Sequence, residues 1–238
     1  MTGSAAPAPR RARAREWART LVVAVGGWLL LRTFVVQAFH ITSESMEHTL
    51  LVGDVLFVAR PLYGAEVPLT RMRLPAMREP RHGDLVVFRS VETPGLEVVK
   101  RVIGLPGDTL AMRQGVVLRD GRPMAEPYVV RDRPDQADPP AARRQMRAWQ
   151  EPRLVARPAG VYDPDRNNWG PVVVPRDSLF VMGDNRDHSY DGRYWGFLPR
   201  GNVDGEPLLV YYSYDPGSWR PLPLFTAVRW RRLFTVPH

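Results

Sequence analysis

The chain has 238 residues, which is enough for one large domain with a sizeable core. It contains no cysteine, and this excludes a thiol nucleophile, a thiolate metal site and a disulfide framework. A formal net charge of +8 leaves nucleic acid and anionic lipid as candidate partners.

The N-terminal part combines a basic leader with an apolar run. The run is uncharged between Arg19 and Arg32, and with these two side chains extended toward opposite surfaces it is long enough to cross a membrane. We expect a cytoplasmic leader over residues 1–16, one transmembrane helix over 17–38 and a body outside the membrane over 39–238.

Beyond residue 40 the sequence is typical of β-structure. Short runs rich in β-branched and aromatic residues alternate with turns that contain Gly and Asp. Strands are predicted at residues 55–58, 85–88, 98–103, 116–118, 179–182 and 208–212. The body is therefore predicted to be all-β, built from twisted antiparallel sheets. Residues 123–175 are rich in Pro, Arg and Asp and predict a loop-rich insertion, with weak helical periodicity only at 141–150.

Two hydroxyl groups follow the apolar run directly, in the segment Ser43-Glu44-Ser45-Met46. In an extended segment Ser43 and Ser45 lie on the same face. One hydroxyl could attack a substrate while the other donates a hydrogen bond to the developing oxyanion. Taken alone, the same pattern is also typical of an ordinary polar loop.

Lys100 is the only lysine among 33 basic residues. Lysine can lose its proton when it is buried, whereas arginine cannot. In a strand, Lys100 shares a face with Val98 and Val102, and Arg101 points to the other face. The two valines would exclude water and lower the pKa of the amine. A lowered pKa suits a general base near neutral pH. The alternative is a surface lysine on an edge strand that discourages aggregation.

The third candidate segment is residues 183–196, a short loop after an apolar strand that holds acids, arginines and Ser189. Arginine–carboxylate pairs would hold such a loop in place. A calcium loop is the alternative, but the arginines would oppose a cation and the spacing does not match an EF-hand. His188 could suggest a Ser–His–Asp triad, but no histidine of the chain lies in a motif for one.

Together these segments resemble the type I signal peptidases, serine proteases that use a Ser–Lys dyad. The resemblance rests on four boxes in the family's order, at residues 43–54, 82–88, 99–108 and 183–196. It covers the anchor and the body from about Phe34 to Tyr212, apart from the insertion at 123–175. It implies an all-β domain of the signal peptidase and repressor-peptidase type, preceded by one transmembrane helix. It also implies cleavage of N-terminal signal peptides from secreted preproteins after small-x-small motifs.

The resemblance assigns a role to each matching residue. Ser45 would be the nucleophile, and Lys100 would take its proton and later pass it to the leaving amine. The Ser45 backbone N–H and the Ser43 hydroxyl would form the oxyanion hole, and Ser189 would orient Lys100. Four residues would hold the last loop without reacting: Asp184, Arg186, Asp191 and Arg193. Shallow pockets for small side chains would be lined by Phe39, Ile41, Leu56 and Val99.

The resemblance implies no metal and no cofactor. The expected partners are preprotein signal peptides and membrane lipid, with no nucleic acid, and the chain is expected to act as a monomer. It would lie in the plasma (inner) membrane as a single-pass protein, with its catalytic domain on the outer (periplasmic) face.

Three positions depart from the family's pattern. Thr42 and His48 stand where the family usually has proline, and Glu44 stands where it commonly has glycine. A glycine there could serve a positive φ angle, and a carboxylate near Lys100 would favour the charged amine. We therefore expect Glu44 to keep a negative φ angle and to point to solvent.

Four alternatives to a membrane-anchored signal peptidase stay open. The apolar run could be a cleaved signal peptide, with residues 36–38 as its cleavage site. An autocleaving repressor-type peptidase would need a DNA-binding helical domain in front, which is not seen. A basic non-enzymatic module would bind nucleic acid or an anionic membrane through Arg143-Arg144 and residues 229–232, although solvated charged faces explain both clusters. An inactive relative would not be expected to keep Ser45, Lys100 and Ser189.

Overall fold

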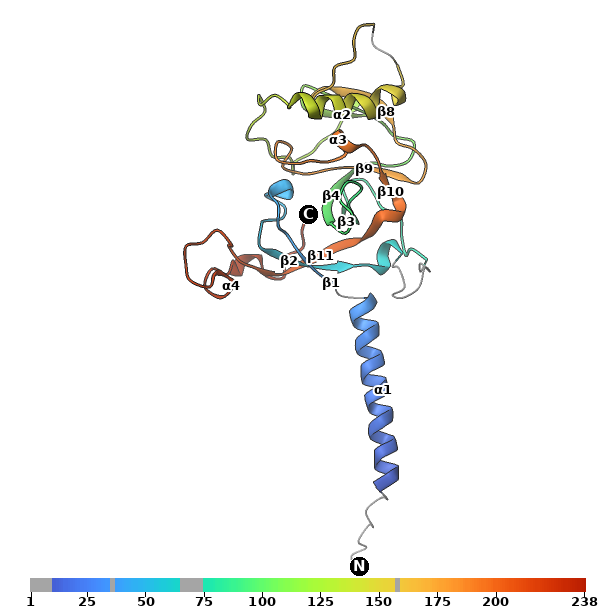
Figure 1. The fold of residues 1–238 in the computed structure, drawn as a ribbon, viewed down its shortest axis with the longest axis vertical. Helices are drawn as coiled ribbons and strands as arrows, with labels where there is room; N and C mark the ends of the chain where they lie inside the picture. Colours follow the sequence, from blue (N-terminus) through green and yellow to red (C-terminus); the bar gives the residue numbers. More distant parts are fainter. Residues whose placement is uncertain (1–9, 35–36, 65–74, 157–158) are drawn as a thin grey trace, which may run out of the picture.

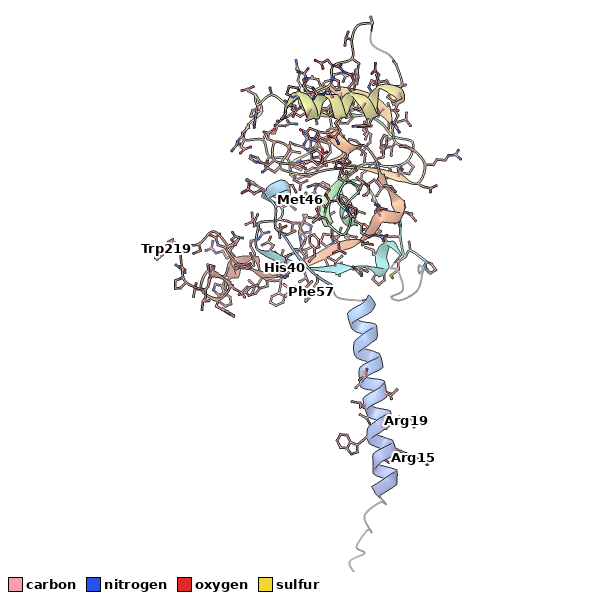
Figure 2. All side chains as sticks on the ribbon, in the orientation of Figure 1. Arg15, Arg19, His40, Met46, Phe57 and Trp219 are labelled. Atoms are coloured by element: carbon pink, nitrogen blue, oxygen red, sulfur yellow. The ribbon has the colours of Figure 1, made fainter. Side chains whose placement is uncertain are left out.

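The structure is a computed structural model that describes residues 10–34, 37–64, 75–156 and 159–238. Helix α1 (Arg10–Phe34) projects from a β-rich body (Figure 1). Arg15 and Arg19 lie on the part of α1 that is farthest from the body (Figure 2). Within the described ranges, no helix is both long enough and apolar enough to cross a membrane. The anchor expected over 17–38 therefore stays a prediction.

The body is built on two antiparallel sheets, as predicted. The larger sheet has seven strands, in the spatial order β1 (Gln37–His40), β2 (Asp54–Ala59), β11 (Val203–Ser213), β3 (Leu85–Arg89), β4 (Glu97–Gly104), β9 (Ser178–Met182) and β10 (Leu198–Pro199). The smaller sheet has four, in the order β7 (Arg122–Pro123), β6 (Val116–Arg119), β5 (Thr109–Arg113) and β8 (Trp169–Val173). All six predicted strands are confirmed, and β1, β5, β7, β8 and β10 are additional.

Short helices complete the body. They are α2 (Pro140–Gln150), α3 (Gly192–Trp195), α4 (Pro223–Thr226) and the 3-10 turns η1 (Glu44–Met46), η2 (Pro61–Tyr63), η3 (Glu151–Arg153), η4 (Arg200–Asn202) and η5 (Trp230–Arg232). The range 123–175 is thus more than loop, because it holds α2 and also β8, which pairs with β5. In Figure 1, α2 and β8 lie at the end of the body opposite to α1.

Three apolar clusters fill the body, and each of them includes a residue of β4. Val99 points into the cluster that also contains Ile41, Leu50 and Leu56, beneath the turn that bears Ser45. Val102 belongs to a second cluster, formed mainly by residues of β3, β9 and β10. The third cluster lies between the smaller sheet, β9 and α2. Strand β4 is paired on both sides, with β3 and with β9, so its side chains are held in a fixed register.

Candidate active site

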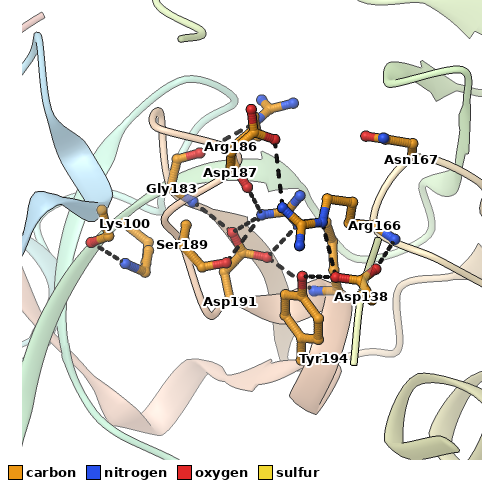
Figure 3. A network of polar contacts seen from close by, with 12 residues as sticks. Lys100, Asp138, Arg166, Asn167, Gly183, Arg186, Asp187, Ser189, Asp191 and Tyr194 are labelled. Carbon is orange, nitrogen blue, oxygen red and sulfur yellow. Dashed lines mark hydrogen bonds and ion pairs between the residues drawn. The ribbon is translucent and has the colours of Figure 1, made fainter. Parts of the chain in front are cut away.

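Ser45 and Lys100 are 55 residues apart in the sequence and meet in the structure. Ser45 lies in the 3-10 turn η1, and Lys100 lies on β4, where Val86 of β3 is its partner. The Lys100 amine and the Ser45 hydroxyl form a hydrogen bond (Figure 3). Both side chains are almost fully buried, Lys100 being 3% exposed. The structure therefore brings together the two residues expected to react.

The surroundings of Lys100 favour its neutral form. Burial lowers the pKa of Lys100 from 10.5 to about 8, and the positive charge of Arg193 adds to this effect. The carboxylates of Asp191 and Asp184 act in the opposite direction, because they stabilise the ammonium ion. With a pKa of about 8, roughly one Lys100 amine in ten is neutral at pH 7, which is enough for a general base.

Ser43 lies next to the reactive pair. Its hydroxyl oxygen is 3.2 Å from the Ser45 hydroxyl oxygen, and its extended backbone leads into the turn η1. The Ser45 carbonyl accepts a hydrogen bond of 3.2 Å from the Asn185 backbone N–H, which joins the turn to the loop 183–196. Ser43, Ser45 and Lys100 all line one cleft, so a molecule bound there would contact all three.

The cleft has a volume of about 330 Å³ and a mostly apolar wall. Of the residues expected to form substrate pockets, Phe39, Ile41 and Val99 line it. Leu56 does not, because it is fully buried in the cluster beneath. The wall also includes Met46, Tyr190 and Trp195, which the sequence analysis did not single out.

Ser189 is buried beside the pair but forms no hydrogen bond with Lys100. Its hydroxyl faces the Asp191 carboxylate and helps to lower the pKa of that group, yet it has no well-aligned partner in the described part of the chain. Gly183 makes this arrangement possible. A Cβ atom at Gly183 would lie 2.3 Å from Ser189 Oγ and 2.4 Å from the Ser45 carbonyl oxygen.

The four loop residues expected to be structural all take part in buried polar contacts, and Figure 3 shows those around Arg186 and Asp191. Asp191 accepts from Arg193 Nε at 2.9 Å and from the Gly183 N–H at 3.0 Å. Burial raises the pKa of Asp191, but the charge and hydrogen bonds of Arg193 outweigh this and lower it below its ordinary value. Arg186 donates to the Gly183 carbonyl at 3.1 Å. These contacts fix the loop against the strand that precedes it.

Arg101 is a partner that the motifs did not identify. It binds Asp184 through two hydrogen bonds, from Nε at 2.8 Å and from Nη2 at 2.6 Å. Its guanidinium also stacks on the ring of Tyr128, 3.9 Å from the centroid. The alternation of side chains along β4 already placed Arg101 on the face opposite to Lys100. An arginine inside an apolar strand needs a carboxylate partner, and this need was the signal that could have identified the contact.

The insertion supplies further partners. Glu126 binds Arg186, with Oε1 2.5 Å from Nη2. Asp138 accepts hydrogen bonds of 2.9 Å from the Tyr194 hydroxyl and from Arg166 Nε (Figure 3). No motif surrounds either acid, so neither could be found from the sequence. Among the described residues, no group of three or more His, Cys, Asp or Glu side chains could hold a metal ion.

The departures from the family's pattern have clear outcomes. Glu44 is exposed, does not have a positive φ angle, and places Oε2 3.9 Å from His188 Nδ1 rather than on Lys100. The expectation for Glu44 is therefore confirmed. His48 has a φ angle of 77°, which proline cannot adopt. At this point the backbone follows a path that the usual proline would not allow.

Comparison with known proteins places the chain in a family. The family model described as signal peptidase, peptidase S26, matches residues 14–212. The chain belongs to this family. As a member of the signal peptidase family it is a serine peptidase, and hence a hydrolase.

Several relatives match most of the chain. Signal peptidase I of Pseudomonas aeruginosa is 33% identical, over 84% of this chain and 73% of that protein. Signal peptidase I of Leptolyngbya laminosa is 34% identical, over 88% and 86%. A probable signal peptidase I-1 of Synechocystis is 33% identical, over 91% and 90%. A crystal structure of a signal peptidase I from Enterococcus faecalis is 25% identical and covers 55% of this chain and 98% of that one, with a TM-score of 0.37.

Proposed function

We propose that the chain is a membrane-bound endopeptidase that removes N-terminal signal peptides from secreted preproteins, cutting after small-x-small motifs. The observation that carries the proposal is the hydrogen bond between the buried Lys100 amine and the Ser45 hydroxyl at an apolar cleft. Membership of the signal peptidase family supports the class of substrate. In this proposal Ser45 is the nucleophile and Lys100 the general base.

The chemistry follows from the positions of the two groups. The neutral Lys100 amine accepts the proton of the Ser45 hydroxyl while the oxygen attacks the scissile carbonyl. The carbonyl oxygen becomes negative and accepts hydrogen bonds from the Ser45 backbone N–H and the Ser43 hydroxyl. When the peptide bond breaks, the Lys100 ammonium gives its proton to the leaving amine. Lys100 then activates the water that hydrolyses the acyl ester and regenerates Ser45.

The loop 183–196 serves this chemistry without reacting. Ser189, whose hydroxyl has no well-aligned partner within the described ranges, is free to hold the Lys100 amine in line. Asp184, Arg186, Asp191 and Arg193 hold the loop through their buried contacts. No metal or cofactor takes part in the proposed reaction.

We also propose that α1 anchors the chain in the plasma (inner) membrane, with the body on the outer (periplasmic) face and the protein acting as a monomer. A helix of 25 residues is about 37 Å long, and its apolar residues Leu21, Val22 and Val23 are exposed. Its basic start would stay in the cytoplasm. Protease added to spheroplasts should digest the body and spare the leader. A protected body would reverse this topology, and mature protein starting at Phe39 would replace the anchor with a cleaved signal.

The decisive experiment is cleavage of a preprotein by the purified full chain in detergent. Ser45→Ala, Lys100→Ala and Lys100→Arg should each abolish cleavage, whereas Ser218→Ala, which lies away from the cleft, should match the wild type. Lys100→Arg is the sharpest of these variants because arginine keeps the charge but cannot release a proton. Circular dichroism would establish that each variant is folded. Substantial activity in folded Lys100→Arg would refute the Ser–Lys assignment.

A further inference from the structure

The basic cluster at residues 229–232 turns two of its three arginines toward the segment that bears the proposed nucleophile. We call residues 41–54 the nucleophile loop. The loop is closed at its base, where the Ile41 N–H donates to the Asp54 carbonyl and the Gly53 N–H donates to the Ile41 carbonyl, both at 2.9 Å. It carries Ser45 near its start, so whatever holds the loop also sets the position of Ser45.

Arg232 binds the base of the nucleophile loop at three points. Its Nε lies 3.0 Å and its Nη2 2.6 Å from the two carboxylate oxygens of Asp54, which is fully buried. The same Nη2 donates to the Thr49 carbonyl at 3.0 Å. Asp54 also accepts from the Leu51 N–H at 2.8 Å, inside the loop. Arg232 therefore both neutralises the buried carboxylate and holds the turn that the carboxylate stabilises.

Arg229 adds a second contact from the same segment. Its Nη1 donates to the Val52 carbonyl at 2.8 Å. The segment is itself fixed to β11 of the larger sheet, since the Val210 N–H donates to the Thr235 carbonyl at 2.8 Å. The Arg229 backbone N–H donates to the Ser213 carbonyl at 2.9 Å. The two arginines thus extend from a supported backbone rather than from a free end.

The opposite side of the nucleophile loop rests on the loop next to Lys100. The Thr49 hydroxyl donates to Asp184 Oδ2 at 2.6 Å, and Asp184 is bound by Arg101, the chain neighbour of Lys100. Thr49 is therefore held from two sides, through its carbonyl by Arg232 and through its hydroxyl by Asp184. A shift of this residue would move Ser45, four positions earlier, relative to the lysine.

We propose that Arg232, assisted by Arg229, is a positioning residue for Ser45, acting through Asp54 and Thr49. This inference rests on the proposed function, in which Ser45 is the nucleophile. Residues 213–238 lie beyond the part of the chain that the family model matches. The two arginines that hold the nucleophile loop therefore come from outside the matched region. In this proposal Arg229 and Arg232 stabilise the position of the turn that carries Ser45, whereas Arg231 is exposed.

The test compares Arg232→Ala with Arg231→Ala in the full-length protein. Both variants remove one arginine from the same turn, but only Arg232 touches the nucleophile loop. A misplacement of about 1 Å can cost roughly 100-fold in rate, so Arg232→Ala should lower kcat by about 10- to 100-fold. KM should change less than kcat, because Arg232 itself does not line the cleft. Arg231→Ala should equal the wild type in both constants. Arg232→Lys should fall between, because an ammonium cannot bind both Asp54 and the Thr49 carbonyl in the same way.

The outcomes separate positioning from mere stabilisation. The assay is run well below the unfolding midpoint of each variant, so that a loss of stability alone leaves kcat unchanged. Wild-type kcat in folded Arg232→Ala would overturn the proposal. If Arg232→Ala does not fold, the test uses Arg232→Lys and Arg229→Ala instead. A wild-type kcat in both of these variants would overturn the proposal. Ser45→Ala is measured alongside: activity there refutes the proposed function, whereas an inactive Ser45→Ala with fully active Arg232 variants refutes only the positioning role.

Discussion

Asp191 and Arg193 form an ion pair with no exposed surface, and the two residues act on the pKa of Lys100 in opposite directions. Asp191 raises this pKa by stabilising the ammonium ion, and Arg193 lowers it by repulsion. Because the pair is nearly neutral as a unit, burial decides the protonation of Lys100. The loop thus places two charged groups close to Lys100, but their effects on its pKa largely cancel. The pKa stays lowered by burial.

Replacing either member of this pair should shift the dependence of rate on pH. Arg193→Gln removes a positive neighbour, so the pKa of Lys100 should rise and the rate should increase only at higher pH. Asp191→Asn removes a negative neighbour, so the profile should move to lower pH. Initial rates against pH for the two variants and the wild type check this. Both variants will be less stable, because breaking a buried pair costs about 3–5 kcal/mol. Shifts in the same direction would contradict the assignment.

Lys100→Met should abolish activity and yet stabilise the fold at neutral pH. In the folded protein the pKa of Lys100 is about 8, against 10.5 for an ordinary lysine. Between these pH values the unfolded chain holds more protons, so wild-type stability rises with pH across this window. Below pH 8 the side chain is a buried ammonium, which lowers the free energy of unfolding by about 3 kcal/mol, and Met would remove this cost. Urea unfolding of both proteins should show a difference that is largest at pH 7 and vanishes above about pH 10.5. A difference independent of pH would mean that Lys100 is not buried as an amine.

Ser43→Ala should leave the fold intact and lower turnover by roughly 10²–10³, the usual effect of losing one oxyanion donor. The hydroxyl lies 3.2 Å from the Ser45 oxygen and is exposed to the cleft, so its removal leaves no buried gap. The measurement is kcat and KM with a preprotein, together with the unfolding midpoint. An unchanged kcat would exclude Ser43 from the mechanism.

Substrates with small side chains one and three positions before the cut should be preferred. Ile41 and Val99 narrow the cleft next to the reactive pair. Replacing Ala by Leu at either substrate position should lower cleavage roughly tenfold or more. Val99→Ala should recover part of the lost cleavage of the Leu substrate, because it widens the cleft. Equal cleavage of Ala and Leu substrates by the wild type would refute this model of the pocket.

The sequence predicted well where local chemistry decides the structure. The alternation around Lys100 correctly placed Arg101 on the opposite face, and the runs of β-branched residues gave six strands. Strands β5 and β8 were missed because neither is a continuous run of strand-forming residues: Ala111 and Arg113 dilute β5, and Gly170-Pro171 interrupts β8. Pairing with β6 and with each other makes them strands. Strand β1 was missed because it follows the apolar run directly and was assigned to its end.

The motifs of the candidate site were predictable from the sequence, but the residues that hold those motifs in place were not. Ser45, Lys100 and the loop 183–196 were found because each lies in a compact box. The partners Glu126 and Asp138 act on residues 60 and 56 positions away, and Arg232 acts on Asp54 across 178 positions. Such pairs depend on how the sheets bring distant segments together, and no local pattern encodes that distance.

The single lysine also gives this enzyme a built-in chemical label site. Every other basic side chain is a guanidinium or an imidazole, so reagents selective for primary amines have one side-chain target, Lys100. An amine with a pKa of about 8 is largely unprotonated in mildly alkaline solution, although its burial beside the cleft restricts access. Reductive methylation followed by mass spectrometry would therefore report whether the cleft is open or filled. A bound substrate should shield the amine, and its release should expose it again.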